Sequence, residues 1–119
     1  MRLAPPVATI LDGYPKLLAW LERVLAFGGG TSVPMASDEA VGLAAATASH
    51  APTHVEPGLG FDAGTVVTVS ATDYGSDPVA GTLVGLDRDS VTVERHDERA
   101  GTVHVHFPRI GFQIRKDRA

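Results

Sequence analysis

The sequence predicts an α+β fold, with two short helices followed by a small five-stranded antiparallel β-barrel of the SH3-like or OB-like type. Over residues 65–114, apolar residues alternate with polar ones in five runs, as in strands with one buried face, and turn residues separate the runs. Before them, apolar residues recur at spacings of three and four, which indicates a helix. We therefore expect residues 1–51 to hold the helices and their linker, and residues 52–119 to form the barrel.

The clearest helix is expected over residues 14–28. Pro15 suits a first helical turn, where its missing N–H would have no partner, and Gly28 suits a C-terminal cap. The apolar stripe of this helix consists of Leu17, Trp20, Leu21, Val24 and Phe27. A single helix of this length is marginal in water. We expect the stripe to dock on another helix, on the barrel or on a second chain, with Trp20 as an anchor in preference to a ligand-stacking residue.

A second and weaker helix is expected after the linker of residues 28–34. Ser37 is the predicted N-cap, and Asp38 and Glu39 complement the positive end of the helix dipole. The three glycines of the linker do not predict a phosphate-binding loop, because no strand precedes them and no Gly-Lys-Ser/Thr ending follows.

The predicted strands of the barrel are short and closely connected. They span residues 65–71, 79–86, 91–95, 102–107 and 110–115. Gly81 and Gly85 indicate bends or bulges that let a small sheet curl. Because all the connections are short, we expect an antiparallel meander that closes or nearly closes.

Charge and composition limit the partners of the chain. Its 119 residues carry a formal charge of −4, which divides into −1 for residues 1–51 and −3 for residues 52–119. Neither part is basic enough to attract a phosphate backbone, so nucleic acid is not the expected partner. The absence of cysteine excludes a disulfide and a zinc–thiolate site and fits a cytoplasmic location. We expect no membrane span or signal peptide, because no apolar run is long enough and two prolines interrupt the first residues.

Two histidines stand out on the fourth predicted strand. His104 and His106 are two residues apart, so both rings should project from one face of the sheet. With Asp73 or His96 as a third ligand they could form the metal site of a barrel enzyme. We favour the simpler interpretation, a strand face that carries two half-polar rings, because no metal-binding motif is present. His50 and His54 are not expected to share a ligand, since Pro52 interrupts the helix between them.

Two further residues are candidates for contact with a ligand or partner. Tyr74, in the loop after the first strand, could donate a hydrogen bond to a ligand at the barrel mouth, although a ring that covers the barrel end is the favoured interpretation. Arg109 follows Pro108 at a strand end, and its planar guanidinium could bind a carboxylate. A surface ion pair is the simpler role for it.

The first helix resembles a helix near the chain end of glutathione S-transferases, in their all-helical C-terminal domain. The resemblance rests on the pattern Tyr14-Pro15-x-Leu17-x-Ala19-Trp20-Leu21-x-Arg23-Val24. The continuation through residues 27–40, and the segments 66–81 and 105–111, resemble a bacterial subgroup of that family with an added β-rich tail. Together these segments span nearly all of the chain.

The resemblance implies that this sequence corresponds to a C-terminal piece of such a protein. The family binds its cofactor, glutathione, in an N-terminal thioredoxin-like domain, for which 119 residues that begin inside the helical region leave no room. No catalytic or cofactor-binding residue of the family can therefore be placed on this sequence. The implied partners are the missing thioredoxin-like domain or a second copy of the chain, and the implied state is catalytic incompetence.

A second function remains open from the residues themselves. A helix followed by five curled strands is also the layout of Sm-like and SH3-like binding modules, which bind a protein or nucleic-acid partner. The segment Val79-x-Gly81-x-Leu83 weakly resembles the Sm-like pattern. The negative charge of the predicted barrel argues against RNA.

Overall fold

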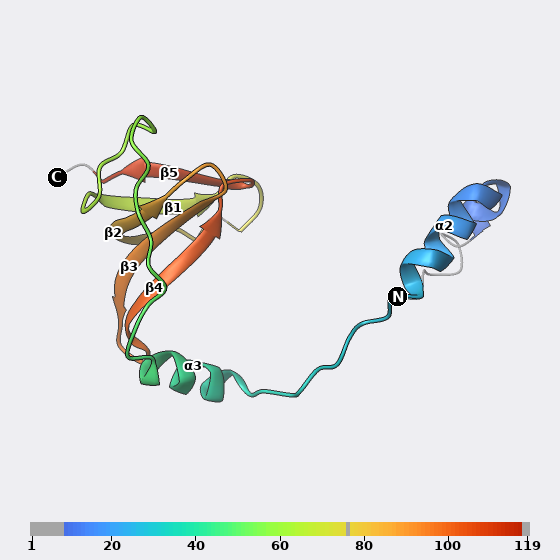
Figure 1. Cartoon of the computed structure of the whole chain (residues 1–119), viewed down its shortest axis with the longest axis horizontal. Coiled ribbons are helices and arrows are strands. Elements are labelled where there is room, and N and C mark those ends of the chain that lie inside the picture. The colour runs from blue at the N-terminus through green and yellow to red at the C-terminus, as the bar shows by residue number, and fades with distance from the viewer. Residues whose placement is uncertain (1–8, 76, 118–119) are drawn as a thin grey trace. The chain divides into compact units, whose positions relative to one another are not determined.

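The computed structural model describes residues 9–75 and 77–117, and the chain divides into two compact units, Met1–Pro34 and Met35–Ala119. Figure 1 shows their elements. The second helix belongs to the same compact unit as the sheet. The division into parts 1–51 and 52–119 stays a prediction.

The first unit contains a short 3-10 helix, η1 (Thr9–Gly13), and the helix α2 (Pro15–Leu25). Pro15 is the first residue of α2, as predicted. Gly28 adopts a left-handed conformation with φ 69°, and its N–H donates to the Leu25 carbonyl at 3.0 Å. Only glycine adopts that conformation at little cost. The C-cap of α2 is nevertheless Ala26, so the predicted cap at Gly28 is wrong, and Gly28 ends the turn that follows the helix.

The apolar stripe of α2 is exposed within its unit. No residue of α2 is buried, and the exposed fractions of Leu17, Trp20 and Val24 are 42%, 51% and 40%. A helix of 11 residues with so much apolar surface in water gains little from burial. The stripe therefore has the properties of a surface that packs against something else.

The second unit begins with α3 (Ser37–Ala46). The N-cap is Ala36, with an extended backbone and no side-chain capping bond, so the predicted N-cap at Ser37 is wrong. The reason is that Ser37 is already the first helical residue, which removes the extended backbone that a capping hydroxyl needs. Asp38 and Glu39 do lie in the first turn, where the helix dipole favours negative charge.

Five antiparallel strands form one curved sheet in the order β4-β3-β2-β1-β5 (Figure 1). They are β1 (Val66–Ala71), β2 (Val79–Leu86), β3 (Ser90–Asp97), β4 (Gly101–Pro108) and β5 (Phe112–Lys116). All five predicted strands are present, which confirms the α+β class. The fifth begins two residues later than predicted, because Ile110 lies in the turn before it and is 92% exposed.

The sheet is not closed by hydrogen bonds, so the predicted barrel is not confirmed. Strands β4 and β5 are the two edges, and β5 pairs with β1 through Val69 and Ile114. The chain leaves the meander at the turn before β5, where Gly111 has φ 83° and its carbonyl accepts the N–H of Thr72, next to β1. After this turn, the last strand pairs with β1 and forms the edge of the sheet opposite β4. The prediction of a simple meander was therefore wrong for β5.

One apolar core lies inside the sheet. Its fully buried residues are Val67, Val69, Leu83, Leu86, Val91 and Val93. Val105 and Phe112 pack against them as partly buried neighbours, so all the strands contribute to a single interior. This confirms the alternation on which the strand prediction depended.

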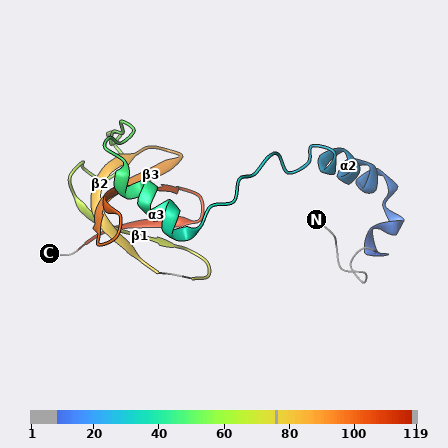
Figure 2. The same ribbon diagram turned by 90° about the horizontal axis from the view of Figure 1, so that it is seen from below.

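The segment after α3 covers part of the outer face of the sheet, and Figures 1 and 2 show it running past β3 and β2. The Thr53 hydroxyl donates to the Val84 carbonyl at 2.7 Å, and Val55 forms a parallel bridge with Leu86. A side chain at Gly85 would place Cβ 2.8 Å from Thr53 Cβ, so only glycine allows this approach. The predicted irregularity is found here, as a register shift between Leu83 and Gly85.

Candidate functional site

The outer face of β3 and β4 carries a cluster of three titratable side chains. Glu94 and His104 come from these strands, and His50 comes from the segment that follows α3. His104 Nε2 lies 3.0 Å from Glu94 Oε2, and the His104 side chain is 12% exposed. The His50 ring stacks on the His104 ring, with centroids 3.9 Å apart and planes at 12°. A strand residue, its cross-strand neighbour and a residue of the covering segment therefore meet at one point.

The contacts of this cluster are structural, because they join the segment after α3 to the sheet. With Nε2–H donating to the Glu94 carboxylate, the lone pair of a neutral His104 lies on Nδ1. That atom is buried and has no hydrogen-bond partner within the described residues. A shallow pocket of about 150 Å³ adjoins the rings, between Thr47 and Val103. The stacking of His50 on His104 joins the segment after α3 to the sheet, and Nδ1 of His104 is closed off from solvent.

His106 is separated from this cluster by its own hydrogen bond. It lies opposite Thr92 in the β3–β4 register, and its Nδ1 is 2.9 Å from the Thr92 hydroxyl oxygen. Thr92 is 2% exposed, so this bond satisfies a polar group inside the covered face. His104 and His106 do project from the same face, as predicted.

The described residues include no group of three or more His, Asp or Glu side chains that could hold a metal ion. The suggested third ligands are not brought to the two histidines in such a group. His104 and His106 are used instead in bonds to Glu94 and Thr92.

The remaining candidate residues lie apart from the histidines. Tyr74 is 97% exposed in the β1–β2 loop, so its ring does not cover the end of the sheet, and that interpretation was wrong. Arg109 donates from Nη1 to the Asp87 carbonyl at 3.1 Å, and not to an acidic side chain. Trp20 lies in the first unit, on the exposed stripe of α2. A functional role for these residues stays a prediction.

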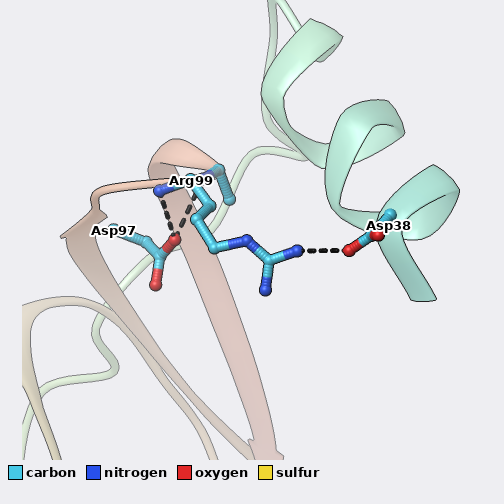
Figure 3. A network of polar contacts seen from close by, with 4 residues as sticks. Asp38, Asp97 and Arg99 are labelled. Carbon is cyan, nitrogen blue, oxygen red and sulfur yellow. Dashed lines mark hydrogen bonds and ion pairs between the residues drawn. The ribbon is translucent and has the colours of Figure 1, made fainter.

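An ion pair links α3 to the β3–β4 turn, as Figure 3 shows. Arg99 Nη2 lies 2.6 Å from Asp38 Oδ1, with the two side chains 65% and 88% exposed. In the same turn, the Asp97 carboxylate accepts the backbone N–H groups of Arg99 and Ala100, both at 2.9 Å. Those bonds, with that to Ala100 the largest cause, lower the pKa of Asp97 below its ordinary value.

The β2–β3 turn repeats this arrangement. The Asp87 carboxylate accepts the backbone N–H groups of Asp89 and Ser90, at 2.8 and 2.7 Å. These two bonds, led by the one to Asp89, lower the pKa of Asp87. Aspartate in the first position of a turn is a sequence signal for such bonds, and it accounts for both turns.

No helix in the described ranges is long and apolar enough to cross a membrane.

Comparison with protein-family models and with curated proteins finds no match. Among solved structures, the chain is similar to a GST-like protein from Pseudomonas syringae, with 41% sequence identity and a TM-score of 0.82. The match covers 95% of this chain and 41% of the Pseudomonas chain, so the present sequence spans less than half the length of that relative.

The fold and this likeness define the chain as glutathione S-transferase-like. The resemblance inferred from the sequence is thereby confirmed. The comparison does not favour the alternative of an Sm-like or SH3-like binding module.

Sequence reasoning missed the partners that make the histidine cluster. His50 was set aside because Pro52 breaks the helix, yet the extended chain brings its ring onto His104. Glu94 was not singled out, although alternation puts it on the outer face of β3, opposite His104. Register could have indicated the His104–Glu94 pair; no local signal indicates the stacking of His50.

Proposed function

We propose that these 119 residues serve as the C-terminal part of a glutathione S-transferase-like protein and do not conjugate glutathione by themselves. The observation that carries the proposal is the extent of the match. Nearly all of this chain aligns with well under half of the Pseudomonas protein. Glutathione would then be bound by a thioredoxin-like domain that lies outside this sequence.

The surface of α2 supports this proposal. The apolar stripe around Trp20 is exposed, and no residue of α2 is buried. A surface of this kind marks an interaction site in a soluble protein. We assign it to packing against the remaining helices of the complete protein or against a second copy, in the cytoplasm.

The second unit would act as an accessory module. Its five strands bury one core, and its histidine cluster is closed to solvent at the atom that could act as a base. We therefore assign no step of a transferase reaction to it.

Conjugation of glutathione to 1-chloro-2,4-dinitrobenzene tests the proposal. The purified chain should give no turnover above the uncatalysed rate. In the second arm, the rest of the Pseudomonas protein is added to the purified chain. We expect the two to form a complex that elutes together from a sizing column. Turnover by the purified chain would refute the proposed incompetence. A chain that forms neither this complex nor a dimer with itself would refute the role assigned to α2.

A further inference from the structure

A surface groove of about 350 Å³ lies between α3 and the β3–β4 hairpin. Its apolar lining comes from Val41 and Ala44 of α3 and from Val103 and Val105 of β4. Val41 and Ala44 are the only residues of α3 that are partly buried. The helix therefore turns its small apolar side to β4, and these small side chains leave the groove unfilled.

The rim of this α3 groove contains an arginine whose guanidinium is not hydrogen-bonded to any described residue. Arg95 of β3 lines it and is partly buried, and its side chain makes no hydrogen bond or ion pair within the described residues. Its charge does act on Asp97, whose pKa it helps to lower, but the two side chains are not in ion-pair contact. Asp97 also lines the groove, but its Oδ1 atom already accepts two backbone N–H groups of the turn. Since a guanidinium that is partly removed from water gains from a charged acceptor, Arg95 is the group that a ligand would satisfy.

A carboxylate already occupies the other arginine of the rim. Arg99 lines the groove and holds the Asp38 carboxylate at 2.6 Å (Figure 3). The Arg99–Asp38 pair thus shows that a guanidinium at this edge of the groove can donate to a carboxylate. Among the described residues, no carboxylate lies at ion-pair distance from Arg95.

We propose that the α3 groove binds a small organic carboxylate with an aliphatic body, whose carboxylate pairs with Arg95 and whose chain lies on Val41, Val103 and Val105. The volume is within the range of pockets that bind small molecules. Inorganic phosphate would leave the apolar floor in water, and a neutral hydrocarbon would leave Arg95 unpaired. A ligand with both parts satisfies the whole lining.

Octanoate is a suitable probe, titrated into the full chain and followed by amide chemical shifts. We expect saturable shifts at Arg95, Val103 and Val105, and binding of octanol, which has the same chain without the charge, at least about tenfold weaker. Arg95→Ala should weaken octanoate binding by a similar factor. Arg115→Ala, which removes an arginine of β5 that does not line the groove, should leave binding unchanged.

Three results would overturn the proposal. The first is no saturable shift in the groove with octanoate. The second is equal affinity for octanoate and octanol, or for the parent chain and Arg95→Ala. The third is that the shifts fall only on α2, which would show that the probe binds its exposed apolar stripe. If Arg95→Ala does not fold, Arg95→Lys is the variant to test. It keeps the charge and should retain part of the binding.

Discussion

Replacing Gly81 with alanine tests the packing of β2 against β3. A Cβ at this position would lie 2.6 Å from the backbone carbonyl oxygen of Glu94 and 3.1 Å from Val93 Cβ. Neither contact can be relieved by turning the end of a flexible side chain, because one atom is backbone and the other is a Cβ. One strand must therefore move by several tenths of an ångström, next to a core residue that is fully buried.

We expect Gly81→Ala to lower the free energy of unfolding by about 1–3 kcal/mol, the usual cost of overpacking. The matched control is Gly42→Ala in α3, where an added Cβ meets nothing within 4 Å. In an open helical position alanine is favoured over glycine by about 0.5–1 kcal/mol, so the control should be neutral or stabilising. Urea denaturation followed by far-ultraviolet circular dichroism measures both, since the single Trp20 lies outside the sheet unit. A Gly81→Ala protein as stable as the parent chain would refute the close approach of the two strands.

Three further predictions concern the polar contacts of the second unit. Backbone N–H groups lower the pKa of Asp97 below 3.8, so its contribution to stability is present above that pH and is lost as the pH falls through the lower folded value. Asp97→Asn should therefore flatten the acid side of a plot of melting temperature against pH. An unchanged slope would contradict this. Arg99→Ala removes an exposed ion pair with Asp38 and should cost less than about 1 kcal/mol in thermal unfolding, so a larger loss would mean that this pair holds α3 in place. His104→Ala should cost about 0.5–3 kcal/mol and speed amide exchange around His50, and unchanged exchange there would show that the ring stack does not anchor the segment.

The strands could be predicted because burial follows the alternation of their residues. Val67 and Val69 on β1, and Val91 and Val93 on β3, are almost completely buried, as their spacing indicates. The start of α2 was predictable too, because the fixed backbone angle of proline suits the first turn of a helix.

The pairing of β5 could not be predicted from spacing. Alternation shows which residues of a strand face inward, but it does not show which neighbour the strand will pair with. Here the turn that includes Gly111 leads β5 to β1, so the sheet remains open between β4 and β5. Ile110 fits the alternating pattern yet lies in that turn, which is why the strand was predicted to start too early.

Only part of the candidate site could be predicted from the sequence. Two histidines on one strand could be seen, and their common face is found in the structure. What they bind depends on register and on the path of the covering segment. Glu94 reaches His104 from the neighbouring strand, and His50 arrives from a distant part of the chain. Contacts of this kind arise from tertiary structure, and no local pattern encodes them.

Calorimetric titration of reduced glutathione into the purified chain is the most direct test of the assignment to a C-terminal piece. If the glutathione site belongs to a domain outside these 119 residues, no saturable heat should be seen at millimolar ligand. Saturable binding of glutathione would contradict the assignment, because it would place a cofactor site within this sequence.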